Sequence, residues 1–266
     1  MINRQTATPA TNIPVATRPA GFEQLGAILS AMNEQLAALS EADFAAETDC
    51  AGWRVRDVVA HLASSAEEMK WPWGFPVRTA RGRRRYPELA PLDARNQIQI
   101  DDLAALDNEE LLAFYRQRQP VALAGIQRMP AFLRRAKMPS GLPGVPKIRI
   151  AYLMDVICAR DVWMHAIDIH QATGKVRVVS AHDEAVIDQI VRDLGVTWSG
   201  STIELRLSGA SNSWWILGAG QPTAQVTVDA VQFCRLLAGR PTDQLPELMA
   251  GEPAALTEIT AARVLF

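Results

Sequence analysis

Two ionisable residues, Asp161 and His165, lie four positions apart in the segment from Ile150 to Gly174. Apolar residues before them recur at helical spacing and predict that the whole segment is one helix; they are Ile150, Leu153, Met154 and Ile157. Continued at 3.6 residues per turn, that apolar stripe runs into Asp161 and His165. Residues four apart project from one helix face, which is the spacing by which a helix offers two ligands to one metal ion.

A third candidate ligand, His61, lies in another predicted helix, whose buried face is marked by Val55, Val58, Val59 and Leu62. With Asp161 and His165 it makes a set of two histidines and one carboxylate. Three protein ligands leave a coordination position open, which is typical of a catalytic rather than a structural metal site. The sequence leaves an alternative open, in which each histidine is a hydrogen-bonded core residue and Asp161 pairs with Arg160 or Arg54.

Two further carboxylates are candidates for orienting these imidazoles by hydrogen bonding, a common arrangement around metal-bound histidines. Asp168 follows His165 by three residues on the same face, and Asp57 precedes His61 by one turn. Either could instead be an ordinary hydrogen-bond acceptor. His170 points away from the Asp161 and His165 direction and is not expected to be a ligand.

The rest of the N-terminal part predicts further helices and loops. Apolar residues three and four apart from Phe22 to Leu39 predict a helix suited to a bundle. A capping box at 107–110 predicts another helix, which Pro120 should kink or split. The stretch 71–91, which includes the basic run RGRRR, is predicted to be a long loop, and 138–146 a turn.

The composition changes after Gly174. An amphipathic helix is predicted over 182–198, strands over 203–207, 214–217 and 224–228, and a helix over 229–238. The sequence therefore predicts three parts: a flexible tail at 1–20, an all-α four-helix bundle at 21–174 and a small α+β domain at 175–266.

Bulk properties exclude several classes of partner. The formal net charge of -2 gives no reason to expect nucleic acid or an anionic membrane. No apolar run approaches the length of about 20 residues that spans a bilayer, and the N-terminus lacks the apolar region of a secretory signal. Three widely spaced cysteines, Cys50, Cys158 and Cys234, are expected to be free thiols of a cytoplasmic protein. A monomer and a homodimer are both compatible with the sequence.

Two segments resemble signatures of a known family. GWRVRDVVAHL at 52–62 and RDVWMHAID at 160–168 resemble those of the maleylpyruvate isomerase N-terminal domain family. That family belongs to the DinB-like superfamily of metal-binding four-helix bundles, and its members are largely actinobacterial. The segment DAVQFCRLLAGR at 229–240 resembles the C-terminal domain of the family, a sterol-carrier-protein-like α+β fold.

The resemblance implies a function as well as a fold. It implies that His61, Asp161 and His165 bind a divalent metal such as zinc, with Asp161 where the family usually has Glu. It also implies dependence on mycothiol or a similar thiol, and an isomerase or S-transferase acting on a small-molecule electrophile. It identifies no catalytic residue in the C-terminal domain.

Two other functions stay open at this point. The first is a non-catalytic ligand-binding or regulatory protein, which the change from Glu to Asp161 favours. The second is a thiol-independent, metal-dependent hydrolase, in which Asp168 or a neighbouring residue acts as base.

Overall fold

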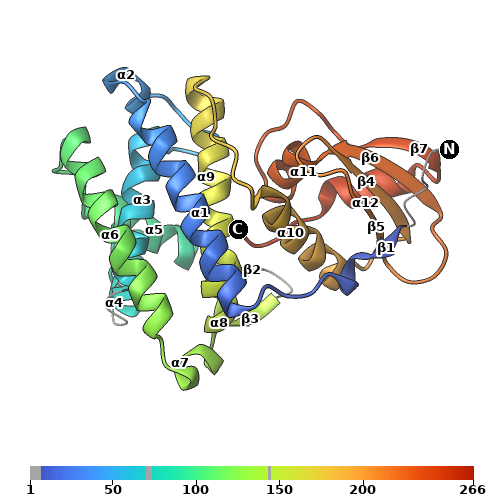
Figure 1. The fold of residues 1–266 in the computed structure, drawn as a ribbon, viewed down its shortest axis with the longest axis horizontal. Coiled ribbons are helices and arrows are strands. Elements are labelled where there is room, and N and C mark those ends of the chain that lie inside the picture. Colours follow the sequence, from blue (N-terminus) through green and yellow to red (C-terminus); the bar gives the residue numbers. More distant parts are fainter. Residues whose placement is uncertain (1–6, 70–73, 143–144) are drawn as a thin grey trace. The chain divides into compact units, whose positions relative to one another are not determined.

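The computed structural model describes residues 7–69, 74–142 and 145–266, and the chain divides into two compact units (Figure 1). One unit is Arg18–Ser180. The other combines Ala181–Phe266 with the N-terminal residues up to Thr17. The first unit is mostly helical and the second contains a mixed sheet, which confirms the prediction of a mainly helical part followed by a part with a sheet. The first unit is not all-α as predicted, because it also contains a two-stranded sheet.

Four helices form the centre of the helical unit: α1 (Arg18–Ala37), α3 (Val55–Glu68), α6 (Asn108–Arg128) and α9 (Cys158–Thr173). Helices α1 and α3 each contact both α6 and α9 (Figure 1). Their buried side chains are mainly aliphatic, so burial of apolar surface holds the four helices together. The capping box predicted for α6 is present, because Asp107 accepts the amide of Glu110 at 2.8 Å and Glu110 accepts that of Asp107 at 3.0 Å.

The segment from Ile150 is helical as predicted, with one irregularity. It begins as α8 (Ile150–Tyr152), widens into a π-helical turn, η2 (Leu153–Ile157), and continues as α9. Gly174 ends it in the left-handed conformation, with φ of 66°. The π turn places the carboxylate of Asp155 in a buried ion pair with Arg134.

The long loop predicted over 71–91 is corrected by the structure. Its described part contains α4 (Gly74–Arg85), which includes the basic run, and α5 (Pro91–Asp101) follows. Arg78 and Arg81 of α4 both bind Asp102, at 3.1 and 2.7 Å, which ties α4 to the end of α5. Residues 70–73 lie outside the described part of the chain.

Two smaller predictions are also corrected. Helix α6 continues through Pro120 without being split. The predicted turn at 138–146 is part of a hairpin of β2 (Lys137–Leu142) and β3 (Val145–Arg149), and residues 143–144 lie outside the described part. The remaining short helices of this unit are α2 (Glu41–Phe44) and α7 (Ala131–Arg135).

The pairing of Asp102 with two arginines predicts a pH-dependent contribution to stability. Partial burial opposes ionisation of this carboxyl, but hydrogen bonds from Arg81 and Arg78 outweigh it and hold its pKa below the usual value. A lowered pKa stabilises the fold above the ordinary pKa of aspartate, and that stabilisation is lost as the pH falls through the folded-state value. Asp102→Asn should therefore cost about 1 kcal/mol at pH 7, a figure reduced for solvent screening.

Urea denaturation at pH 7 and at pH 3 measures this effect. The difference between wild type and Asp102→Asn should shrink at pH 3 and in 1 M salt. Asp93→Asn is the control, since Asp93 is an exposed residue of α5, the helix that Asp102 directly follows. An equal loss of stability at both pH values would contradict the ion-pair explanation.

The second unit contains a five-stranded mixed sheet in the order β1-β5-β4-β6-β7. Strands β4 (Ile203–Ser208), β5 (Trp214–Leu217) and β6 (Ala224–Asp229) match the predicted ones, and so do α10 (Asp183–Thr197) and α11 (Ala230–Leu237). Burial alternates along β4 and β6, as period-two patterning requires of a strand with one buried face. Strand β7 (Glu247–Gly251) and helix α12 (Ala254–Ala261) complete the unit.

The flexible tail predicted at 1–20 is corrected over its described residues. Thr8–Pro9 forms β1, an edge strand parallel to β5, and Ala10–Asn12 forms a helical turn, η1, that packs on α10. The sequence could not predict this strand, because two residues are too few to show the alternating pattern of a strand. In the part of the chain that the structure describes, no helix has the length and apolar character needed to cross a membrane.

Candidate metal centre

The structure brings the three predicted ligands together inside the helical unit. His61 of α3 and His165 of α9 are both buried, and their ring centroids are 5.3 Å apart. Asp161 lies between them: one carboxylate oxygen is 3.5 Å from Nε2 of His61, and the other is 3.5 Å from Nε2 of His165. One ligand atom from each residue lies within 4.8 Å of the other two.

These separations fit a shared metal ion better than direct hydrogen bonds. Hydrogen bonds between nitrogen and oxygen are usually about 2.9 Å long, and 3.5 Å lies beyond their normal range. Ligand atoms held at 2.0–2.2 Å from a tetrahedral zinc ion are separated from one another by roughly 3.4 Å. The spacing of the two Nε2 atoms from the carboxylate of Asp161 is therefore that of a donor set around a cation.

The opposite nitrogen of each imidazole has its own buried acceptor. Nδ1 of His61 lies 2.8 Å from Oε1 of Gln99, and Nδ1 of His165 lies 2.9 Å from Oδ2 of Asp168. With Nδ1–H donating to these oxygens, Nε2 is the nitrogen of each ring that faces Asp161. Gln99 is held in turn, because its amide nitrogen donates to Ser65 at 3.2 Å. Both histidines are thus oriented as metal ligands require.

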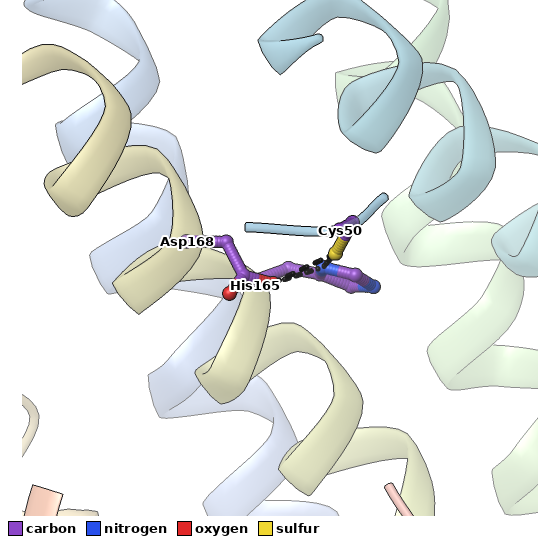
Figure 2. Close-up of side chains that lie close together, drawn as sticks. All are labelled: Cys50, His165 and Asp168. Atoms are coloured by element: carbon purple, nitrogen blue, oxygen red, sulfur yellow. Dashed lines mark hydrogen bonds and ion pairs between the residues drawn. The ribbon is translucent and has the colours of Figure 1, made fainter. Parts of the chain in front are cut away.

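A cysteine adds a further donor to this arrangement. Figure 2 shows Cys50, from the loop before α3, converging with His165 and Asp168 of α9. The Cys50 thiol donates to Oδ2 of Asp168 at 3.2 Å and lies 3.8 Å from Nδ1 of His165. Cys50 therefore contacts the side of the imidazole opposite Asp161 and shares the acceptor that orients His165.

Negative charge around His165 sets its protonation. Burial alone would lower the pKa of His165, but the hydrogen bond to Asp168, the contact with Cys50 and the charge of Asp161 together raise it to about 10. The carboxylates that stabilise a proton on this imidazole would equally attract a divalent cation. A cation bound at Nε2 would replace that proton.

Trp53 covers the imidazole pair. Its ring centroid is 5.2 Å from that of His61 and 6.0 Å from that of His165, where the two rings are stacked at 23°. Trp53 therefore forms one side of the candidate metal site.

The thiol of Cys158, one turn before Asp161, is poorly suited to act as a nucleophile. Burial, followed by the nearby charges of Asp161 and Asp155, raises its pKa to about 12. The thiolate is the reactive form of cysteine, and at neutral pH Cys158 would hold almost none of it. Cys158 is therefore not a candidate for the nucleophile of a thiol reaction at this centre.

The outer residues were predicted only in part. Asp168 contacts His165 as expected. The role predicted for Asp57 is corrected, because its carboxylate accepts the amide of Arg54 at 2.9 Å and caps the start of α3. The hydrogen-bond partner of His61 is Gln99 instead. Gln99 lies on α5, a helix that was not predicted from the sequence. Pro91 at a helix start, followed by spaced Ala94 and Ile98, was the signal available for it.

The position of Gln99 predicts that it supports metal binding from outside the ligand set. Gln99→Leu keeps the side-chain size but removes the acceptor of His61 Nδ1–H, so the imidazole loses its fixed tautomer. Metal affinity should fall by about 10- to 100-fold, measured by competition with a chromogenic chelator. Gln97→Leu on the same helix is the control, since Gln97 bonds Asp101 instead. Equal affinities in both variants would show that Gln99 has no such role.

Comparison with known proteins identifies the family of this chain. The sequence profile of the mycothiol maleylpyruvate isomerase N-terminal domain matches residues 25–170. The crystal structure of the mycothiol-dependent maleylpyruvate isomerase shares the fold, with a TM-score of 0.58 and 18% identity over 92% of this chain and 97% of that one. A mutant of that isomerase, with alanine in place of one histidine, gives a TM-score of 0.57 at the same identity and coverage. No curated protein matches the chain. Because the profile spans more than half of its length, the chain belongs to the mycothiol maleylpyruvate isomerase N-terminal domain family.

Proposed function

We propose that this chain is a metal-dependent and thiol-dependent enzyme, an isomerase or S-transferase of the maleylpyruvate isomerase type. The observation that carries the proposal is the convergence of two imidazole Nε2 atoms on the carboxylate of Asp161, each at 3.5 Å. Membership of the family supports the thiol, because the family and the similar solved structure are both named for mycothiol.

We also infer the finer features of the fold from this family. The mutual contacts of α1, α3, α6 and α9 support a DinB-like four-helix bundle. The mixed sheet with α11 supports a sterol-carrier-protein-like C-terminal domain. The metal centre belongs to the bundle alone, since its ligands come from α3 and α9.

The donor set suits a divalent ion such as zinc. Imidazole and carboxylate are ordinary zinc ligands, and three of them leave a position for an exogenous group. When bound, such an ion lowers the pKa of a coordinated thiol and so makes its thiolate available at neutral pH. The chain itself holds His61 and His165 in the ligand tautomer through Gln99 and Asp168.

The other parts of the proposal follow from the same residues. The nucleophile is a small external thiol such as mycothiol, for which the family and the similar solved structure are named; the raised pKa of Cys158 makes that side chain a poor alternative. The second reactant is a small-molecule electrophile. Cys50, Cys158 and Cys234 form no disulfide with one another.

Metal analysis and a thiol assay test this function. Untagged protein is purified, stripped with chelator and reloaded with zinc, and turnover of electrophiles is followed with and without mycothiol. The proposal expects bound metal and turnover that requires both the metal and the thiol. Turnover with metal but without thiol would support the hydrolase instead. Binding of mycothiol without turnover of any electrophile would support a non-catalytic ligand-binding protein.

A further inference from the structure

A small cavity adjoins the metal centre within the helical unit. It is enclosed by α1, α3, α6 and α9, has a volume of about 60 Å³, and includes Asp161 in its wall. Asp161 is also the residue that faces both imidazoles. Asp161 is therefore common to the cavity wall and the candidate ligand set.

Most of the cavity wall is aliphatic. Side chains of α1, α3 and α6 line it, among them Leu25, Leu29, Leu62, Ala122 and Ile126. Asp161 is the only charged residue among the described residues that line it, and no lysine or arginine is among them. Placing a carboxylate there would remove its hydration, and the wall has no basic side chain to compensate for that loss. The wall favours an uncharged, apolar group.

One buried polar group in the wall is available to a ligand. Tyr115 is 1% exposed, and its hydroxyl makes no hydrogen bond of normal length and angle with the described residues. The neighbouring amide of Gln119 is already paired with Asn33, to which it donates at 3.1 Å and from which it accepts. A buried hydroxyl without a partner costs about 1–3 kcal/mol, so a ligand oxygen at this point would gain from it.

The hydroxyl of Tyr115 is suited to donate rather than to ionise. Burial raises its pKa well above the ordinary value; the neighbouring Gln119 side chain opposes this rise, and the charge of Asp161 adds to it. It therefore keeps its proton at all physiological pH values. A carbonyl oxygen, which can only accept, is the complementary group.

We propose that the cavity selects an uncharged, short-chain α,β-unsaturated carbonyl compound, whose carbonyl oxygen accepts a hydrogen bond from Tyr115. This substrate class rests on the proposed thiol-dependent function. It differs from maleylpyruvate, a dicarboxylate, which the similar solved structure is named for. The volume of about 60 Å³ holds a chain of only a few carbon atoms.

The hydroxyl has a defined part in the reaction. The thiolate sulfur forms a bond to the β-carbon, the π electrons of the C=C bond move toward the carbonyl carbon, and the carbonyl π electrons move to the oxygen. The resulting enolate oxygen accepts a stronger hydrogen bond from Tyr115 than the neutral carbonyl does. Rotation about the former double bond and return of the electrons expel the thiolate and complete an isomerisation. Protonation of the α-carbon by water instead completes an addition.

Binding of an unreactive probe tests the cavity separately from the chemistry. Pentan-2-one, which has the carbonyl but no double bond, is titrated into the full-length protein and followed by ligand-observed NMR. We expect saturable binding that weakens about tenfold in Tyr115→Phe. Ala122→Leu, which fills the cavity, should abolish it. Tyr86→Phe is the control, because the Tyr86 hydroxyl bonds Asp101 away from the cavity.

The same titration with succinate tests the exclusion of charge. Succinate is expected not to bind in the cavity, so any weak binding that it shows should be the same in the wild type and in Ala122→Leu. Equal affinity of pentan-2-one for Tyr115→Phe and Tyr86→Phe would overturn the role of Tyr115. Binding of succinate that depends on Ala122 would overturn the proposed substrate class. Tyr115→Phe removes one buried oxygen and adds no volume, so this variant is expected to fold. The test therefore stays valid even if Ala122→Leu does not fold.

Turnover separates this inference from the proposed function. Zinc-loaded protein with mycothiol should convert pent-3-en-2-one at least 100-fold more efficiently than the dicarboxylate fumarate. Faster reaction of fumarate would leave the thiol-dependent function standing and overturn the substrate class. Reaction of neither compound, with binding of pentan-2-one still dependent on Tyr115, would count against the thiol chemistry and in favour of the cavity as a ligand site.

Discussion

Replacing His165 by alanine should leave the purified chain with little or no bound metal, and His61→Ala should do the same. Each variant removes one of three donors whose Nε2 and carboxylate atoms lie within 4.8 Å of one another. The remaining pair cannot enclose an ion, so the loss of affinity should exceed the roughly 100-fold typical of removing an outer hydrogen-bond partner. Thiol-dependent turnover should fall with the metal. Elemental analysis of untagged protein and the assay with mycothiol measure both effects.

A third histidine provides a control in the same helix. His170 of α9 directs Nδ1 at the carbonyl of Lys175, 2.6 Å away, and takes no part in the ligand set. His170→Ala should bind metal as the wild type does. If His61→Ala and His165→Ala both kept the wild-type metal content, the metal centre and the proposed enzyme would have to be abandoned.

Gly21→Ala should destabilise the helical unit by about 3 kcal/mol, the size of effect expected when a packed backbone contact is overfilled. Gly21 lies in α1, and a Cβ added there would lie 2.3 Å from the carbonyl oxygen of Asp155 in the π turn. The nearest atoms belong to the backbone, so neither helix can relieve the clash by a side-chain movement. Denaturant unfolding measured at neutral pH gives the loss directly.

Gly26 in the same helix is the matched control, because a Cβ there would have no atom within 4 Å. Gly26→Ala should be neutral or should stabilise α1 by about 0.5–1 kcal/mol through its better helix propensity. A similar loss in both variants would mean that the close approach of α1 to the π turn does not matter for stability.

The sequence could point to these candidate ligands because its signals are local. Asp161, His165 and Asp168 share one regular helix, so spacing alone places them on one face. His61 was predictable for the same reason within its own helix, and the family signatures joined the two segments. Spacing could not show that the two helices face each other with their Nε2 atoms toward one carboxylate.

The missed residues depend on contacts between segments. Gln99 reaches His61 from α5, 38 residues away, and Cys50 reaches Asp168 from a loop 118 residues away. Neither residue type announces such a role from its neighbours in sequence. The role of Asp57 was predicted wrongly because a carboxylate in the third position of a helix can also cap the helix start. In this structure the Asp57 carboxylate accepts a hydrogen bond from the backbone amide of Arg54.

The strand β1 gives the order of synthesis a structural consequence. Thr8 and Pro9 pair with Trp215 and Ile216, which leave the ribosome about 200 residues later. The whole of Arg18–Ser180 is made in between, so the helical unit can fold while the first residues still have no sheet to join. The N-terminal segment is therefore the last part of the early chain to find its place, and it completes one edge of a domain made almost entirely from the end of the polypeptide.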